Sequence, residues 1–141
     1  MAAVPPVSPG PRRRWSFYRT ELGADPVRAY LSHLPAGDRA VVGARMRAAL
    51  NNPKTARPVG GDVFEVQASR NGQAHRVLFI REGPTKGDFV ALDAFAKASA
   101  RVPRERLRVA QDRARDWRSR RGRTMTGPEM SGPTMARGAS R

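Results

Sequence analysis

Residues 63–81, VFEVQASRNGQAHRVLFIR, have the pattern of a β-hairpin, and this hairpin decides the fold. Polar and apolar residues alternate in its first half, strand composition resumes in its second half, and Asn71-Gly72 between them is a strong signal for a two-residue turn. Such a turn pairs Arg70 with Gln73 and fixes every other pair by counting back. Because side chains alternate between the two faces of a strand, one face collects residues typical of a core. These residues are Phe64, Val66, Ala68, His75, Val77 and Phe79.

The other face of the predicted hairpin gathers three polar side chains in the middle of the sheet: Glu65, Gln67 and Arg76. This grouping depends on the register, because a slip of one residue would exchange the two faces. It is compatible with an ordinary solvated outer face and with a functional surface. Lys97 and Arg101 follow the next predicted strand and could reach the same surface, which favours the functional interpretation.

These polar side chains have the chemistry of a phosphate site. A guanidinium with a nearby ammonium can hold a phosphate and stabilise charge that develops on it, without a metal ion or a thiol. Arginine suits this role because it stays ionised and presents a planar fork of donors. Glu65 is a candidate proton acceptor, and a structural ion pair with Arg76 is the alternative. His75 points to the apolar face, so we interpret it as a packing residue.

The segments on either side of the hairpin complete an α+β fold. In chain order they are an edge strand over 15–18, helices that begin at Asp25-Pro26 and near Asp38, a third strand over 89–95, and a helix from Pro103. The short connection between the first two helices predicts an antiparallel helical hairpin. The last helix has an apolar stripe and arginines on its other faces. The order β-α-α-β-β-β-α predicts a small antiparallel sheet with an N-terminal helical hairpin and a basic C-terminal helix.

Charge is the most informative feature of the composition. The 141 residues include 27 Lys and Arg against 12 Asp and Glu, and the formal net charge of +15 creates a field that attracts polyanions. The absence of cysteine excludes disulfides and thiolate catalysis, and two scattered histidines do not suggest a metal site, so we expect no metal and no cofactor. No apolar run is long enough to span a membrane and no secretory signal is recognisable, so we expect a cytoplasmic protein.

Composition also divides the chain into a domain and two tails. Residues 1–14 and 122–141 are rich in Gly, Pro, Ser and Thr and have no periodic apolar pattern. Such segments bury too little surface to offset the entropy of ordering, so we predict disordered tails. Residues 15–121 between them are expected to form one domain with a modest core.

Short motifs follow one another in a recognisable order within residues 15–120. They are FEVQ (64–67), HRVLF (75–79), FVALDAFAK (89–97) and SARVP (99–103). This order resembles that of the RelE/ParE toxin superfamily, in which the corresponding segments are "ElR", "yRvly", "vvLLhgFvKK" and "sqktP". The opening, from Trp15 to Leu34, is similar to that of the HigB-like, phage-associated branch of these toxins.

The resemblance implies a type II toxin that cleaves mRNA in the ribosomal A site and is neutralised by a cognate antitoxin, expected to be a small helix-turn-helix protein. In that metal-independent chemistry the ribose 2′-OH attacks the adjacent phosphate and leaves a 2′,3′-cyclic phosphate. Arg76 takes the position of the family's central sheet arginine, which stabilises the transition state, and Glu65 is a possible base. Lys97 takes the position of the first lysine of the "KK" pair, and Arg101 that of the basic residue before the proline. Further candidates for contact with RNA phosphates are Gln67, Arg104 and Arg108.

Two positions depart from the family pattern. Gln67 replaces the basic residue of "ElR", and Ala98 replaces the second lysine of the pair. Either nearby arginines substitute for these cations, or the protein is a weak enzyme, or it uses the scaffold for binding alone. Two other functions stay open: relatives that poison gyrase share this fold without the ribonuclease chemistry, and a plain basic nucleic-acid-binding protein would carry the same charge.

Overall fold

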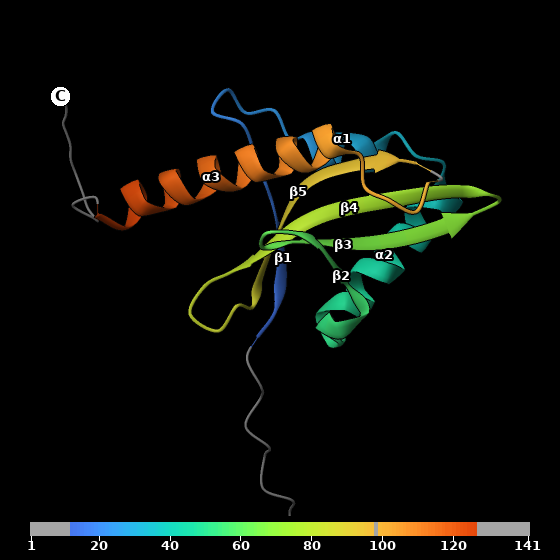
Figure 1. Ribbon diagram of the computed structural model, residues 1–141, viewed down its shortest axis with the longest axis horizontal. Coiled ribbons are helices and arrows are strands. Elements are labelled where there is room, and N and C mark those ends of the chain that lie inside the picture. Colours follow the sequence, from blue (N-terminus) through green and yellow to red (C-terminus); the bar gives the residue numbers. More distant parts are fainter. Residues whose placement is uncertain (1–11, 98, 127–141) are drawn as a thin grey trace, which may run out of the picture.

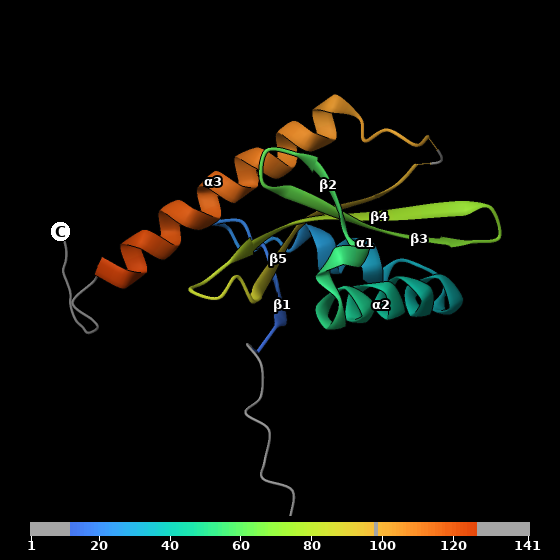
Figure 2. The same ribbon diagram turned by 60° about the horizontal axis from the view of Figure 1, so that its bottom comes forward.

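The computed structural model describes residues 12–97 and 99–126, which form the predicted α+β fold (Figure 1). The elements are β1 (Arg14–Phe17), α1 (Pro26–Ser32), α2 (Ala36–Asn51), the 3₁₀ helix η1 (Pro53–Thr55), β2 (Arg57–Gly60), β3 (Val63–Arg70), β4 (Gln73–Glu82), β5 (Asp88–Ala96) and α3 (Arg104–Thr126). The strands form one sheet in the order β1-β5-β4-β3-β2. Figure 2 shows this sheet between two layers, with α1 and α2 on one face and α3 across the other.

The β3–β4 hairpin has the predicted register. The observed pairs run without a shift from Arg70 with Gln73 to Phe64 with Phe79. The two turn residues at 71–72 have φ angles of 52° and 79°, the left-handed conformation that a type I′ turn requires. The turn therefore determines which side chains of the hairpin share a face.

The face of the sheet toward α1 and α2 holds the first of two cores. Its buried members are Val27, Val42, Met46, Ala49, Ala56, Val66, Ala68, Val77, Phe79, Phe89, Ala91 and Ala94. They include Val66, Ala68, Val77 and Phe79 of the predicted core face of the hairpin, and Phe64 of that face is partly buried and packs against them. Trp15 of β1 packs edge-on against Phe79 and Phe89, with ring centroids 4.9 and 5.4 Å apart. Aromatic pairs of this kind each add about 0.5–1.5 kcal/mol beyond the area they bury, so β1 is firmly attached to the sheet.

A second core lies on the opposite face, under α3, and the alternation of the hairpin does not predict it. Its buried members are Tyr18, Val63, Leu78, Ile80, Val90, Leu92, Phe95, Ala110 and Ala114. The predicted stripe of α3 is confirmed, because Ala110 and Ala114 are buried here while Leu107 and Trp117 pack at the margin. The outer face of the hairpin is consequently polar only toward the turn, where Gln67 lies.

The sheet differs from the prediction at both edges. β2 is an additional edge strand paired with β3, and its sequence, RPVG, contains a proline and a glycine that are typical of loops. β1 is an edge strand as predicted, but it runs parallel to β5, so the sheet is mixed. Parallel pairing is possible because two helices and three strands separate β1 from β5 in the chain.

The predicted tails, 1–14 and 122–141, lie mostly outside the described residues. At their inner ends β1 begins at Arg14 and α3 continues to Thr126, and the division into a 15–121 domain with two tails stays a prediction. Among the helices of the described chain, none combines the length and the apolarity that crossing a bilayer demands.

A buried polar cluster around His75 ties the helical hairpin to the sheet. His75 is on the core side of β4, as predicted, and is only 3% exposed. Its Nδ1 lies 2.7 Å from the hydroxyl oxygen of Tyr30, and its Nε2 lies 2.8 Å from a carboxylate oxygen of Asp38. A neutral imidazole satisfies both partners by accepting from the tyrosine and donating to the carboxylate. The hydrogen bond to His75, together with one from Arg70 at 3.1 Å, holds the pKa of Asp38 below its ordinary value against an opposing effect of desolvation.

Asp38→Asn should make the fold less sensitive to acid. A carboxyl whose pKa is lowered by folding stabilises the native state above its unfolded-state pKa, and this stabilisation is lost as the pH falls through the folded-state pKa. We therefore expect Asp38→Asn to melt at a lower temperature than wild type near pH 7, and to lose less on acidification below about pH 4. Thermal melts across this range measure the effect, with Glu21→Gln at an exposed position as the control. Parallel acid profiles for Asp38→Asn and wild type would contradict the assignment.

Candidate active site

One carboxylate, that of Glu65 on β3, holds two guanidinium groups and forms the centre of the site. Its Oε2 accepts a hydrogen bond from Nη1 of Arg76 at 2.9 Å, and its Oε1 accepts one from Nη2 of Arg57 at 2.8 Å. Arg57 comes from β2 and Arg76 from β4, so three adjacent strands bring these side chains together. The sequence pattern indicates Glu65 and Arg76 but misses Arg57, because β2 has no strand signal.

Arg76 is completely buried, which corrects the expectation of an open polar face around it. The chain between β5 and α3 passes over its guanidinium: Nη1 lies 3.3 Å from the carbonyl oxygen of Ala100, and Nη2 donates to that of Ser99. The Glu65 side chain is 1% exposed, so the two form a buried ion pair. Main-chain carbonyls can cover a buried guanidinium because they satisfy donors that would otherwise need water. Within the described chain, Nε is the one nitrogen of this guanidinium without a hydrogen-bond partner.

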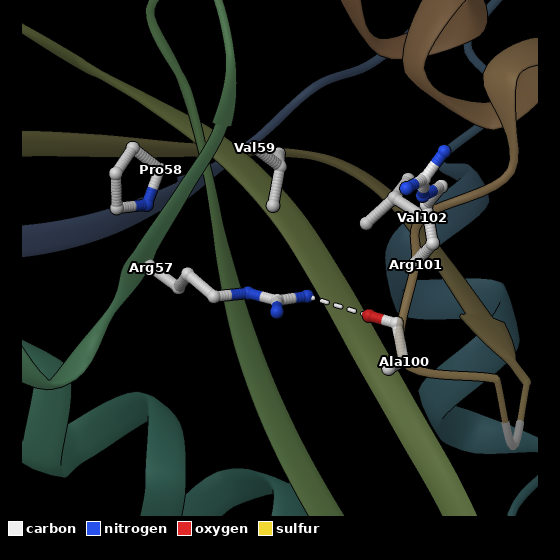
Figure 3. Close-up of a pocket in the computed structure, with 6 residues that line it drawn as sticks. All are labelled: Arg57, Pro58, Val59, Ala100, Arg101 and Val102. Atoms are coloured by element: carbon white, nitrogen blue, oxygen red, sulfur yellow. Dashed lines mark hydrogen bonds between the residues drawn. The ribbon is translucent and has the colours of Figure 1, made fainter.

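Arg57 is the accessible guanidinium of the site. Its side chain is 52% exposed, and it donates to Glu65 and, at 2.9 Å, to the carbonyl oxygen of Ala100. Figure 3 shows the side chain reaching from β2 toward Ala100 on the far wall of a cavity, with Arg101 on the same wall. Two fixed acceptors therefore hold Arg57 in place while about half of its surface faces solvent.

Two cavities share Arg57 and place further cations beside it. The first, of about 360 Å³, is lined by Arg57, Pro58, Val59, Ala100, Arg101 and Val102. The second, of about 240 Å³, includes Arg45, Arg57, Glu65 and Gln67 in its lining. Arg45 of α2 donates from Nε to the main-chain oxygen of Gln67 at 3.1 Å. Gln67, the position where the family pattern has a cation, thus shares the second cavity with two arginines from other elements.

The other predicted site residues lie around these cavities, and the structure does not bring all of them together. Arg101 lines the first cavity and Gln67 the second. Lys97 is exposed at the end of β5, where its main-chain N–H donates to the Ala74 oxygen at 3.0 Å. Arg104 and Arg108 are exposed on the first turns of α3, outside the lining of both cavities. The departure at Ala98 lies outside the described residues.

Three arginines of α3, Arg106, Arg113 and Arg118, bind to carboxylates of the sheet. Arg106 and Arg113 lie 3.3 and 3.4 Å from carboxylate oxygens of Asp93, and Arg118 lies 2.8 Å from one of Glu82. Burial raises the pKa of Asp93, and the two arginines oppose that rise. These internal ion pairs fix α3 on the sheet and leave an exposed set for contact with polyanions. Among residues 104–121 of this helix, the exposed arginines are Arg104, Arg108, Arg115 and Arg121.

Comparisons with known proteins identify the family of the chain. Residues 29–115 match the model of the family described as phage derived protein Gp49-like (DUF891). The chain is also 30% identical over 119 residues to the probable endoribonuclease HigB1 of two Mycobacterium tuberculosis strains, CDC 1551/Oshkosh and ATCC 25618/H37Rv. The matched region covers 82% of this chain and 93% of the relative. The family match contains β2, β3, β4, β5 and about the first half of α3, and with them all three side chains of the Glu65 centre, Arg57, Glu65 and Arg76. The chain therefore belongs to the phage-derived Gp49-like family and is a relative of the HigB1 protein.

Proposed function

We propose that the protein is the toxin of a toxin–antitoxin system and acts as an endoribonuclease on mRNA at the ribosome, in the cytoplasm. The relationship to a probable endoribonuclease supports the reaction class. The observation that carries the proposal is the half-exposed Arg57 guanidinium, fixed by Glu65 at the junction of two cavities that also contain Arg45 and Arg101. Such a cluster fits a phosphodiester, because planar guanidinium forks match the oxygens of a phosphate.

The proposed reaction needs charge stabilisation more than any other aid from the protein. The ribose 2′-OH loses its proton and attacks the adjacent phosphorus, while the 5′-oxygen of the next nucleotide leaves and takes up a proton. The products are a 2′,3′-cyclic phosphate and a free 5′-hydroxyl. Negative charge develops on the phosphoryl oxygens during this step, so fixed cations beside them lower the barrier.

Roles in this reaction follow from exposure. We assign direct phosphate contacts to Arg57 and Arg101, and the path of the RNA to Lys97, Arg104 and Arg108, which are all exposed. Arg76 takes the family position for transition-state charge, and in the present conformation it can act only by holding Glu65, since Ser99 and Ala100 cover it. Both Glu65 oxygens accept hydrogen bonds from guanidinium groups, so we propose that Glu65 positions Arg57 rather than serving as the base.

Mapping of RNA 5′ ends after induced expression tests the function. A ribosome-dependent endoribonuclease produces new 5′ ends within translated reading frames, and these disappear when ribosomes are absent from a reconstituted reaction. Growth arrest without new 5′ ends would indicate that the protein acts by binding gyrase or another target. RNA binding without either effect would leave a plain nucleic-acid-binding protein.

Arg57→Ala should lower the rate of cleavage by about 10²–10³, the usual loss when one fixed donor to a developing charge is removed. The fold should survive, because Arg57 is half exposed and Glu65 keeps its bond to Arg76. Primer extension on programmed ribosomes measures the rate, with kcat and KM determined separately. Arg47→Ala, at an exposed position of α2, removes the same charge away from the cavities and should leave kcat unchanged. Equal kcat for Arg57→Ala and wild type would remove Arg57 from the site.

Gln67→Arg should change cleavage little, because Arg45 and Arg57 already line the cavity beside it. Arg45→Ala should weaken substrate binding, and Gln67→Arg should restore it in that background, since the new guanidinium would enter the same cavity. The KM of the three variants tests this compensation. A large gain from Gln67→Arg alone would mean that the phosphate site lacks a cation, and failure of rescue would place Arg45 outside it.

A further inference from the structure

A second basic cavity lies at the other end of the sheet from Arg57. It has a volume of about 560 Å³. One wall is the segment that leads into β1, with Arg12, Arg13 and Arg14, another is the β4–β5 turn at 82–88, and Arg121 of α3 contributes a fourth arginine. Segments that are far apart in the chain thus direct four guanidinium-bearing residues to one place.

This cavity is separate from the candidate active site. Arg76 lies near the start of β4, and Glu82 lies at its end, six residues farther along the same strand. At about 3.3 Å per residue, this spacing places the second cavity about 20 Å from the Glu65 centre. One short segment of single-stranded RNA bound at Arg57 would therefore not fill both sites.

Both acidic residues of the cavity already have polar partners, and one of these partners is Arg14 of the cavity itself. Glu82 accepts hydrogen bonds from Arg118 at 2.8 and 3.0 Å, and Asp88 accepts one from the Ser16 hydroxyl at 2.6 Å. Asp88 is also 3.7 Å from Nε of Arg14. Within residues 12–97 and 99–126, no carboxylate forms an ion pair with Arg12, Arg13 or Arg121. Nη1 of Arg13 donates to the main-chain oxygen of Leu50 at 2.9 Å, and the guanidinium carbon of Arg121 lies 5.7 Å from the centre of the Trp117 ring. Neither contact compensates the positive charge, so these guanidinium groups can still attract an anion.

Main-chain contacts fix the walls of the cavity. The N–H of Arg14 donates to the carbonyl oxygen of Gly87 at 2.9 Å, and β1 continues in parallel register with β5 from that point. A Cβ atom at Gly87 would collide with the carbonyl oxygen of Arg12, so glycine allows the incoming chain to lie directly on the turn. The turn itself is closed by the N–H of Lys86 on the Gly83 oxygen and by Nε of Arg81 on the Lys86 oxygen, both at 3.0 Å.

We propose that this cavity binds the phosphodiester backbone of a structured RNA, as a second contact distinct from the strand at Arg57. The lining favours RNA over an acidic protein, because Pro84 is the one lining residue with a wholly apolar side chain, whereas protein interfaces depend on aromatic and aliphatic anchors. Arginine forks hold phosphate oxygens in pairs without such anchors. This second site rests on the proposed function and extends it, because the protein would then contact RNA at two places. Measurements of RNA binding test the second site without a measurement of cleavage.

The test compares Arg12→Ala/Arg121→Ala with Arg39→Ala/Arg47→Ala, a control that removes two exposed arginines from α2. A fluorescein-labelled RNA hairpin of mixed sequence is titrated with each full-length protein at several salt concentrations. Each phosphate contact contributes about 0.7–0.9 to the slope of log affinity against log salt. The Arg12/Arg121 variant should lose about 1.5 of that slope and about tenfold in affinity, and the control should keep both. Melting temperatures show whether both variants are folded.

Three results would overturn the second site. The first two are an unchanged salt slope in the Arg12/Arg121 variant and an equal loss of slope in the control. The third is a variant that binds RNA like wild type but binds a second probe, the acidic polypeptide poly-L-glutamate, more weakly. The last result would identify an acidic protein as the occupant. Cleavage of a short mRNA on programmed ribosomes, measured at a saturating concentration of that complex, should keep its kcat in the Arg12/Arg121 variant. If wild type cleaves nothing, the proposed function fails, while the binding slopes still decide whether the second site exists.

Discussion

Arg76→Ala is expected to lower the free energy of unfolding by about 3–5 kcal/mol and to abolish RNA cleavage. The reason is the environment of the buried pair. Glu65 is 1% exposed, and removal of Arg76 leaves its carboxylate with one remaining cationic partner, the half-exposed Arg57. The carbonyl oxygen of Ser99 loses its Arg76 donor at the same time, and that of Ala100 keeps the hydrogen bond from Arg57 alone. Small domains are stable by only about 5–15 kcal/mol, so this is a large share of the total, and the melting temperature should fall by more than about 10 °C.

A double variant separates the structural role of Arg76 from its role in cleavage. Replacing a buried ion pair by apolar residues of similar volume is often neutral or stabilising, whereas removing one partner is costly. We expect Glu65→Leu/Arg76→Met to melt within a few degrees of wild type and still to cleave no RNA, because Arg57 loses the carboxylate that fixes it. Cleavage by the double variant would show that neither residue matters for the reaction. Full stability and full toxicity of Arg76→Ala would contradict both assignments.

The hairpin could be predicted from sequence because its information is local. Asn71-Gly72 selects a two-residue turn with positive φ at both positions, and that turn fixes every pair from Arg70–Gln73 to Phe64–Phe79. The same register correctly places His75 on the core side. Its partners, Tyr30 and Asp38, come from two helices whose position against the sheet is a tertiary property, so the polar cluster could not be foreseen.

The burial of Arg76 could not be predicted, because the cover is made by main-chain atoms. The chain after β5 folds back so that the carbonyl oxygens of Ser99 and Ala100 accept hydrogen bonds from Arg76. The types of side chain in this segment do not indicate the path of its backbone. Arg57 was missed for a different reason: the RPVG segment of β2 is a strand only because β3 offers it an edge. Together, the predicted exposure of Arg76 and the missed Arg57 place the accessible guanidinium on β4, whereas in the structure it lies on β2.

The sequence contains a signal for the second core, which is separate from the alternation of polar and apolar residues in the hairpin. Leu78 and Ile80 are on the same face as Arg76, and α3 carries the small residues Ala110 and Ala114 at the spacing that lets a helix approach closely. A strand buried on both faces has a continuous apolar run, and residues 77–80, VLFI, are such a run. This apolar run is the part of the hairpin that α3 covers. The helix therefore leaves a polar surface only at the end of the sheet near the hairpin turn.

RNA binding should weaken by about 10³ between about 50 and 200 mM salt if six phosphates are held, since each contact releases counterions. The exposed cations around the two cavities and on α3 are sufficient for such a number: Arg45, Arg57, Arg101, Arg104, Arg108 and Arg115. We expect the complex with a small acidic antitoxin to weaken far less over the same range. Antitoxin bound to the outer face of α3 and to the cavities would block the RNA path, and part of its interface should be apolar and therefore insensitive to salt.

The apolar part of that interface should lie near β1, and Leu22 is the residue that tests it. Leu22 is fully exposed in the connection between β1 and α1, beside a strand whose outer edge has no partner strand in the described sheet. Trp117, by contrast, packs against the second core. Leu22→Ser should accordingly weaken antitoxin binding at high salt and leave RNA affinity unchanged, because it alters no charge. The antitoxin for this experiment is sought in the adjacent reading frame, where a small helix-turn-helix protein is expected. Equal salt slopes for the two complexes would indicate a purely electrostatic partner, and stable high-level expression of the protein alone would argue against a toxin.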